Sequence, residues 1–317
     1  MTWDMAPQST GRQGITKARK LAHTYRVKDG SRFRLKSVDP GDTGPITSRQ
    51  QADQWLRWGV GRLQKLQEKL YAQNRWGLLL IFQAMDAAGK DGTIKHVMSG
   101  INPQGCQVYS FKAPSSDDLD HDFLWRTSRC LPERGRIGIF NRSYYEEVLV
   151  VRVHPEILDR QRLPRGLVTK RIWQERFTDI NAFEQYATRN GMAIRKFFLH
   201  VSRGEQKRRF MRRLEEPRRN WKFSLGDTQE RNHWAEYMRV YEDMIRHTSS
   251  DHAPWFVVPA DNKWFTRLVV GAAVIDAMEE MALTFPKVDR EKRKELAAAH
   301  AALAGASRAA GTHRQRA

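Results

Sequence analysis

The chain has 317 residues, and 55 Lys and Arg against 36 Asp and Glu give it a formal net charge of +19. An apolar content of 40% and ten Trp exclude a wholly disordered polycation. No apolar run approaches the ~18 residues of a membrane span, and the basic N-terminus lacks the apolar stretch of a secretory signal. Two cysteines cannot build a disulfide framework, so we expect a cytoplasmic protein without a membrane partner.

Three segments carry most of the positive charge. Residues 1–40, 203–222 and 289–317 have net charges of +6, +6 and +4, which leaves the rest of the chain nearly neutral. Such an excess predicts a polyanionic partner, which could be nucleic acid, acidic lipid or a phosphate-rich substrate. Charge alone does not choose among these three.

The predicted elements alternate between helices and short apolar strands. A basic arm, residues 1–45, ends in the turn-forming run Asp39–Pro45, and residues 48–73 show helical spacing of apolar side chains. Short apolar runs predict buried strands at Gly77–Gln83, Cys106–Phe111, Arg136–Phe140, Arg195–Val201 and Trp255–Pro259. Helical patterns lie between them, and Ser143 and Ser202 each begin a capping box.

This alternation predicts an α/β fold with three layers, α/β/α, around a parallel sheet. We expect one core domain at residues 46–288 that includes a lid at about residues 203–250. The basic, Ala/Arg-rich tail at residues 289–317 is expected to be a frayed helix or disordered.

The first strand runs into a candidate phosphate loop. The segment FQAMDAAGKDGTIK (Phe82–Lys95) places Gly89-Lys90 at the start of a helix, where backbone N–H groups and a Lys can hold phosphate oxygens. The match to G-x-x-x-x-G-K-[ST] is imperfect, since Ala84 replaces the first Gly and Asp91 replaces Ser or Thr. The acidic Asp86 inside the loop suits a metal ion or a transferring group. Candidate nucleotide- or phosphate-binding residues are Ala87, Ala88, Gly89, Asp91, Gly92 and Thr93, with Lys90 reaching the terminal phosphates and Asn141 joining them from the third strand.

A second polar motif follows the third strand in GRIGIFNRSYYEEVLVVRVHPE (Gly135–Glu156). Asn141 stands where a Walker B strand ends in Asp, so it could bind a water or a metal only as a neutral oxygen ligand. Arg142 offers a planar guanidinium to a phosphate beside the loop. The alternative is that Arg142 merely pairs with Glu146 across one helical turn.

A basic stretch then precedes an aromatic and polar run. Residues 203–219 place basic side chains on most faces of a helix, which is usually a solvated face, and WKFSLGD (Trp221–Asp227) follows. Such an element can serve as a kinase lid that closes over the transferring phosphate and excludes water. No signature of a nucleic-acid-binding motif is present to support the competing use.

Together these segments resemble the polyphosphate kinase 2 family, and within it the subgroup that phosphorylates both nucleoside mono- and diphosphates. The resemblance spans about residues 20–285. The segments that carry it are Ala84–Ser115, Leu131–Glu156, Asn220–Ser224 (NWKFS) and Pro259–Arg267 (PADNKWFTR).

The resemblance implies a P-loop kinase-like fold with a helical lid. It also implies transfer of the terminal phosphoryl of inorganic polyphosphate to AMP or ADP with Mg²⁺, in a homo-oligomer (dimer or tetramer). Asp86, Lys90 and Arg142 would be catalytic, with Asp86 also the metal ligand. Residues expected to contact polyphosphate or belong to the lid are Arg208, Arg212, Lys222, Asp227 and Arg231.

Two other functions stay open at this point. One is an ATP-dependent nucleotide kinase that uses the same loop and lid. The other is a non-catalytic nucleic-acid-binding protein that uses the basic stretch.

Overall fold

Five parallel strands form one sheet in the order β2-β3-β1-β4-β5. The structure is a computed structural model that describes residues 11–313. Its strands are β1 (Gly77–Gln83), β2 (Cys106–Ser110), β3 (Ile137–Asn141), β4 (Met192–His200) and β5 (Trp255–Pro259). β1 lies at the centre and is buried throughout, as a continuous apolar run predicts for a strand covered on both faces. The five strand predictions are confirmed, and the observed ends differ from them by at most three residues.

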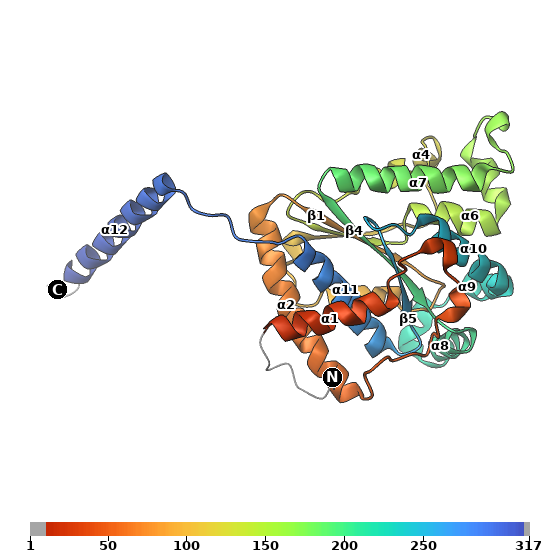
Figure 1. Cartoon of the computed structure of the whole chain (residues 1–317), viewed down its shortest axis with the longest axis horizontal. Coiled ribbons are helices and arrows are strands. Elements are labelled where there is room, and N and C mark those ends of the chain that lie inside the picture. The colour runs from red at the N-terminus through yellow and green to blue at the C-terminus, as the bar shows by residue number, and fades with distance from the viewer. Residues whose placement is uncertain (1–10, 314–317) are drawn as a thin grey trace. The chain divides into compact units, whose positions relative to one another are not determined.

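Helices cover both faces of this sheet, which confirms the predicted α/β architecture (Figure 1). One layer contains α1 (Gly11–Tyr25), α2 (Arg49–Gln73), α3 (Lys90–Val97) and α11 (Lys263–Glu280), and the other contains α7 (Ile172–Arg189) and α10 (Trp234–Thr248). The remaining α-helices are α4 (Ser116–Leu119), α5 (Trp125–Ser128), α6 (Val150–Val153), α8 (Arg203–Glu215), α9 (Leu225–Gln229) and α12 (Arg290–His313). Short 3₁₀ segments are η1 (Gly30–Arg32), η2 (Leu35–Ser37), η3 (Pro103–Gly105), η4 (Tyr144–Val148), η5 (Pro155–Gln161), η6 (Arg165–Leu167), η7 (Pro217–Lys222) and η8 (Glu230–His233).

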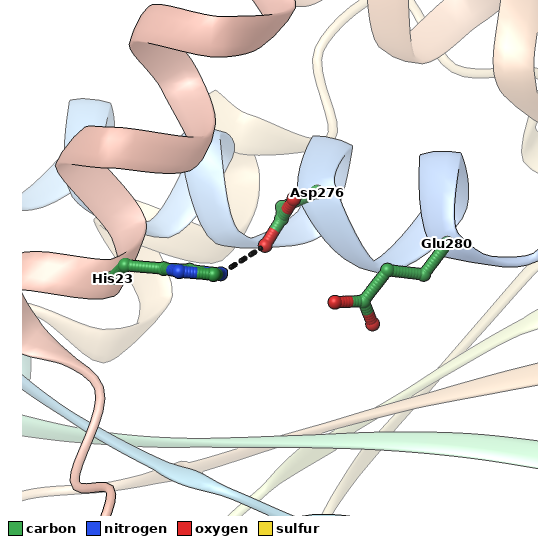
Figure 2. Close-up of side chains that lie close together, drawn as sticks. All are labelled: His23, Asp276 and Glu280. Atoms are coloured by element: carbon green, nitrogen blue, oxygen red, sulfur yellow. Dashed lines mark hydrogen bonds and ion pairs between the residues drawn. The ribbon is translucent and has the colours of Figure 1, made fainter.

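An ion-pair network fastens α1 to α11. His23 of α1 points at Asp276 of α11, and Glu280 lies farther along the same helix (Figure 2). Asp276 is buried and pairs with His23 Nε2 at 2.9 Å and with Arg19 Nε at 2.7 Å. Glu280 pairs with Arg195 of β4. Ligand atoms of His23, Asp276 and Glu280 lie within 4.8 Å of one another, but arginines already neutralise both carboxylates, so we interpret the cluster as structural.

The two ends of the chain belong to different compact units. Residues through Leu283 form one unit, which includes the described part of the basic arm, and Thr284–Ala317 form a second. α12 makes most of the expected tail helical, while residues 1–10 of the arm and 314–317 of the tail lie outside the described residues. Cys106 and Cys130 are free thiols. Within residues 11–313, we find no helix that combines the length and apolarity needed to cross a bilayer.

The polar segments of the sequence meet at one edge of the sheet. Because all five strands are parallel, their carboxyl ends lie together. The loop after β1 starts at Ala84, Arg142 follows β3, Val201 follows β4 and Ala260 follows β5. The candidate phosphate loop, the second motif and the base of the expected lid are therefore neighbours.

The region expected to form the lid contains both exposed and buried segments. α8, η7, α9 and η8 are largely exposed, with Trp221 at 77% exposure. α10 instead buries one face, including Val240 and Met244, against the core. The largely exposed part of this region therefore ends at His233, directly before α10.

Candidate active site

The β1–α3 loop (Ala84–Gly89) turns sharply on two left-handed residues. Ala87 has a φ of 61° and Gly89 a φ of 106°, a value that only glycine adopts easily. Gly89 is the N-cap of α3 and no side chain caps this helix, so the N–H groups of its first turn face away without a helical partner. An uncapped helix N-terminus after a tight turn is a ready site for an anion.

Lys90 begins α3 and folds back across this loop. Its Nζ donates a hydrogen bond to the carbonyl oxygen of Ala84 at 2.9 Å, and its side chain is buried. Burial, and then the nearby charge of Arg142, lower the pKa of the Lys90 ammonium. A bound anion would offset both effects, so this site favours negative charge.

Arg142 joins the second motif to the loop. It has a φ of 66°, and its backbone N–H donates to the carbonyl oxygen of Phe82 at 3.0 Å. Its Nη2 lies 2.9 Å from Oδ1 of Asp86, while its Nη1 lies 3.4 Å from Oε2 of Glu146. The predicted pairing of Arg142 with Glu146 is therefore present, and the shorter contact, to Asp86, holds the guanidinium beside the loop. Phosphate binding by Arg142 stays a prediction.

Several charged side chains lie close together in this partly buried site and shift one another's pKa values. Burial raises the pKa of Glu146, although Arg142 and Lys90 oppose this shift. Burial, and then the charge of Asp86, raise the pKa of Asp227 of α9. Asp227 therefore lies close enough to the loop for Asp86 to affect its titration, and it pairs with Arg213 at 3.3 Å. Cations and carboxylates alternate here, as they do where phosphates and a divalent ion meet.

Asn141 and the start of α3 complete the loop's surroundings. The Nδ2 of Asn141 donates to Oδ1 of Asp91 at 2.8 Å, which leaves the amide oxygen of Asn141 as the possible ligand atom. Thr93 is buried, whereas Asp91 and Gly92 are exposed. The structure thus brings together the loop residues, Asn141 and Arg142, as the sequence predicts.

The residues predicted for the lid differ in whether they connect to the loop. Arg231 donates to Oε1 of Gln206 at 2.5 Å, and Gln206 in turn contacts the loop. Arg208 pairs with Glu205, and Arg212 lies 3.8 Å from Glu216. The Lys222 ammonium lies 4.9 Å above the ring of the exposed Trp221, and no described contact joins it to the loop.

Sequence reasoning missed two buried residues of α8 that contact the loop directly. Gln206 donates to the carbonyl oxygen of Asp86, and Arg209 donates to those of Ala87 and Ala88. Ser202, Glu205, Gln206 and Arg209 share one helix face by their spacing, and this was the available signal. The surrounding run of arginines instead indicated a solvated face.

Lys263 at the start of α11 was also missed. Its side chain is exposed near the arginines of α8 and η7, and its pKa is lowered to about 8 by partial desolvation and then by Arg209, Arg219 and Arg212. In the sequence, its segment PADNKWFTR offers only a resemblance to a family as a signal. The structure shows that this segment lies beside the base of α8, because Arg209 also donates to the carbonyl oxygens of Ala260 and Asp261.

Comparisons with known proteins agree with this arrangement. The model of the family described as polyphosphate kinase 2 matches residues 47–286. An "ADP-polyphosphate phosphotransferase" of Rhodopseudomonas palustris is 52% identical over 86% of this chain and 94% of the relative. An "AMP/ADP-polyphosphate phosphotransferase" of Meiothermus ruber is 41% identical over 85% of this chain and 97% of the relative.

A solved structure shows the same likeness in three dimensions. The crystal structure of polyphosphate kinase 2 from Arthrobacter aurescens TC1 superimposes with a TM-score of 0.80 at 40% identity. The match covers 88% of this chain and 96% of that one. With the family model matched across the sheet, the loop and the lid, the chain belongs to the polyphosphate kinase 2 family.

Proposed function

We propose that this chain transfers the terminal phosphoryl of inorganic polyphosphate to AMP, ADP or both, giving ADP and ATP. The observation that carries the proposal is the meeting of Asp86, Lys90 and Arg142 at the carboxyl edge of the sheet. Relatives that are 52% and 41% identical over the matched residues are named for this chemistry. The reaction requires positioning and charge neutralisation rather than a covalent intermediate.

Different cations of the site would bind the two substrates, polyphosphate and the acceptor nucleotide. The first turn of α3 and the Lys90 ammonium would hold the transferring phosphoryl, since both present positive charge at the loop. Arg142 would bind the phosphates of the acceptor nucleotide with its planar guanidinium. Asp86, which pairs with Arg142, would hold that guanidinium and the acceptor phosphate in line with the phosphoryl group.

The carboxylates around the loop fit Mg²⁺. This ion prefers oxygen ligands and keeps several waters, so one or two partly exposed carboxylates suffice. Asp86 and Asp227 are 26% and 27% exposed, and the charge of Asp86 contributes to the raised pKa of Asp227, as expected of carboxylates that face a shared space. We propose Asp86 as the ligand, and a bound Mg²⁺ would neutralise phosphate charge.

Exposed cations of the lid would guide the polyphosphate chain. Arg208 and Arg212 are 59% and 44% exposed on α8, and Lys222 is exposed on η7. Polyphosphate carries roughly one negative charge per phosphate, so its binding to such a surface should weaken with salt. Asp227 and Arg231 would brace the lid against the loop through Arg213 and Gln206.

A cytoplasmic location is part of the proposal, supported by the two free thiols, which suit a reducing compartment.

The homo-oligomeric state expected from the family resemblance stays a prediction, and light scattering of the purified chain would test it.

An assay without ATP tests the proposed function. Purified protein, polyphosphate, Mg²⁺ and either AMP or ADP should yield ADP or ATP, separated by chromatography. An ATP-dependent nucleotide kinase would give no product until ATP is added. A nucleic-acid-binding protein would give none with ATP either, and would shift DNA or RNA in a gel at moderate salt.

A further inference from the structure

Arg209 is the buried member of the arginine run on α8. Only 7% of it is exposed, although its neighbour Arg208 has a side chain that is 59% exposed. Both pair with the same carboxylate, that of Glu205. The two arginines are adjacent in sequence and share a partner, so they offer a matched comparison of a buried and an exposed guanidinium.

The Arg209 guanidinium uses all of its donors inside the protein. Its Nε donates to Oε1 of Glu205 at 2.6 Å. Its Nη1 donates to the carbonyl oxygens of Ala88 at 2.6 Å and Ala87 at 3.1 Å. Its Nη2 donates to those of Ala260 at 2.6 Å and Asp261 at 3.0 Å. A guanidinium has five N–H donors, and these five bonds leave none for a phosphate.

Gln206, one turn earlier, extends the same contact. It is fully buried, and its Nε2 donates to the carbonyl oxygen of Asp86 at 2.9 Å. Three successive loop carbonyls, those of Asp86, Ala87 and Ala88, therefore face α8. In a trans peptide the N–H of the next residue points opposite to the carbonyl, so the N–H groups of Ala87, Ala88 and Gly89 point away from α8. That of Ala88 donates to the carbonyl oxygen of Met85 at 3.2 Å, which leaves those of Ala87 and Gly89 for an anion.

This contact supports a conformation that the loop would not keep by itself. Ala87 holds a positive φ, which is unfavourable for a residue with a side chain, and such a conformation persists only when its surroundings impose it. The base of α8 is in turn fixed, because Oδ1 of Asp261 accepts from the Ser202 N–H at 2.8 Å. The ends of β1 and β5 and the first turns of α8 thus form one connected unit.

We propose that Arg209 and Gln206 are positioning residues for phosphoryl transfer. From behind the loop they hold its carbonyls toward α8 and its N–H groups toward the substrate phosphates. Arg209 is not part of the polyphosphate track, in contrast to Arg208. This inference rests on the proposed function, because it concerns the same loop, and it separates two roles within one run of arginines.

The matched variants Arg209→Ala and Arg208→Ala test the assignment by splitting kcat from KM. A loop displaced by about 1 Å costs on the order of 100-fold, so Arg209→Ala should lower kcat by about that factor. Its KM for polyphosphate should change less than about threefold, since Arg209 has no donor left for this substrate. Arg208→Ala should instead raise the KM for polyphosphate with a smaller change in kcat.

Chemical rescue distinguishes positioning from a purely structural role. Guanidinium chloride far below denaturing concentrations should restore about tenfold of the lost kcat in Arg209→Ala, because it can refill the vacated site. It should not improve Arg208→Ala. Arg209→Lys, which keeps the charge but cannot reach four carbonyls, should stay folded by circular dichroism and still lose at least about tenfold in kcat.

Two results would overturn the inference. One is a rise in the polyphosphate KM of Arg209→Ala with kcat intact, which would make Arg209 a polyphosphate ligand. The other is a loss of kcat in Arg209→Ala that guanidinium does not reverse and that matches the fraction of the variant that is unfolded. If the unaltered protein makes no ATP from polyphosphate, the proposed function itself fails, and the two failures are thereby distinguished.

Discussion

Asp86, Lys90 and Arg142 are the three side chains on which the proposed chemistry depends. Removing either charge of the loop, in Asp86→Asn or Lys90→Met, should lower kcat/KM for ADP at least about 100-fold, which equals about 2.7 kcal/mol of lost transition-state stabilisation. The rate of ATP formation from polyphosphate measures this effect. Lys95→Met, an exposed lysine of the same helix, is the control and should keep most of its activity.

The same substitutions should leave the fold intact. Burial lowers the pKa of Lys90, so the charge of its ammonium adds little to the stability of the folded protein, and Lys90→Met should not destabilise it by more than about 1 kcal/mol. Retention of most activity by Asp86→Asn or Lys90→Met, with Lys95→Met equally active, would refute these roles.

Lys263 gives the site a testable dependence on pH. Because partial desolvation and the nearby arginines lower its pKa to about 8, the ammonium loses its proton as the pH rises through that value. One positive charge then leaves the junction of α8 and α11, and a polyanion should bind less tightly. We expect the KM for polyphosphate to rise about threefold between pH 7 and pH 9, the effect of one partly screened charge. Lys263→Arg should flatten this rise, and an unchanged rise in that variant would assign the titration elsewhere.

At the scale of elements, we propose different roles for the exposed side and the buried side of α8. Arg208→Glu and Arg212→Glu should each raise the KM for polyphosphate by about three- to tenfold, because a favourable contact becomes a repulsive one. The KM for ADP should change less than about twofold. Arg171→Glu, at a side chain that is 82% exposed before α7, is the charge-matched control. Equal effects on both substrates would argue against a polyphosphate track on α8.

A buried ion pair fixes the segment that follows β3. Lys196 of β4 and Glu184 of α7 are fully buried, with Nζ and Oε2 at 2.6 Å. Oε1 of Glu184 accepts from the hydroxyls of Tyr144 and Tyr145, both at 2.8 Å. These tyrosines follow Arg142 by two and three residues, so the pair anchors the segment that carries this guanidinium.

Removing one partner of this pair should destabilise the protein much more than replacing both partners. Lys196→Met leaves Glu184 buried without its cation and should lower the free energy of unfolding by about 3–5 kcal/mol, measured by urea titration. The double variant Lys196→Met/Glu184→Gln removes both charges and should recover at least half of that loss. A loss below about 1 kcal/mol in the single variant would show that the pair does not anchor the segment.

For the whole molecule, the sequence allowed prediction of the sheet and the loop but not of the contacts behind the loop. The strands were predictable because β1 and β5 are continuous apolar runs, and Gly89-Lys90 after a strand indicated a phosphate loop. Even so, the apolar run of β4 contains the buried Lys196, whose partners are distant in sequence.

The contacts of Arg209 show why the rest could not be predicted. Its partners Ala88 and Ala260 lie 121 and 51 residues away along the chain, and only the folded sheet brings them together. Local composition indicated a solvated helix face, which holds for Arg208 but not for Arg209. Likewise, Ser143 and Glu146 matched the capping box of an α-helix. Ser143 instead caps the 3₁₀ segment η4, where its hydroxyl accepts from the Tyr145 N–H.

The most direct test of the account follows the phosphoryl group itself. Polyphosphate labelled uniformly with ³²P is incubated with unlabelled ADP, Mg²⁺ and the protein, and the ATP formed is separated and degraded stepwise. The account predicts label in the γ-phosphate of ATP and none in the α- or β-phosphates. Unlabelled ATP, or no ATP at all while the protein remains folded, would contradict it.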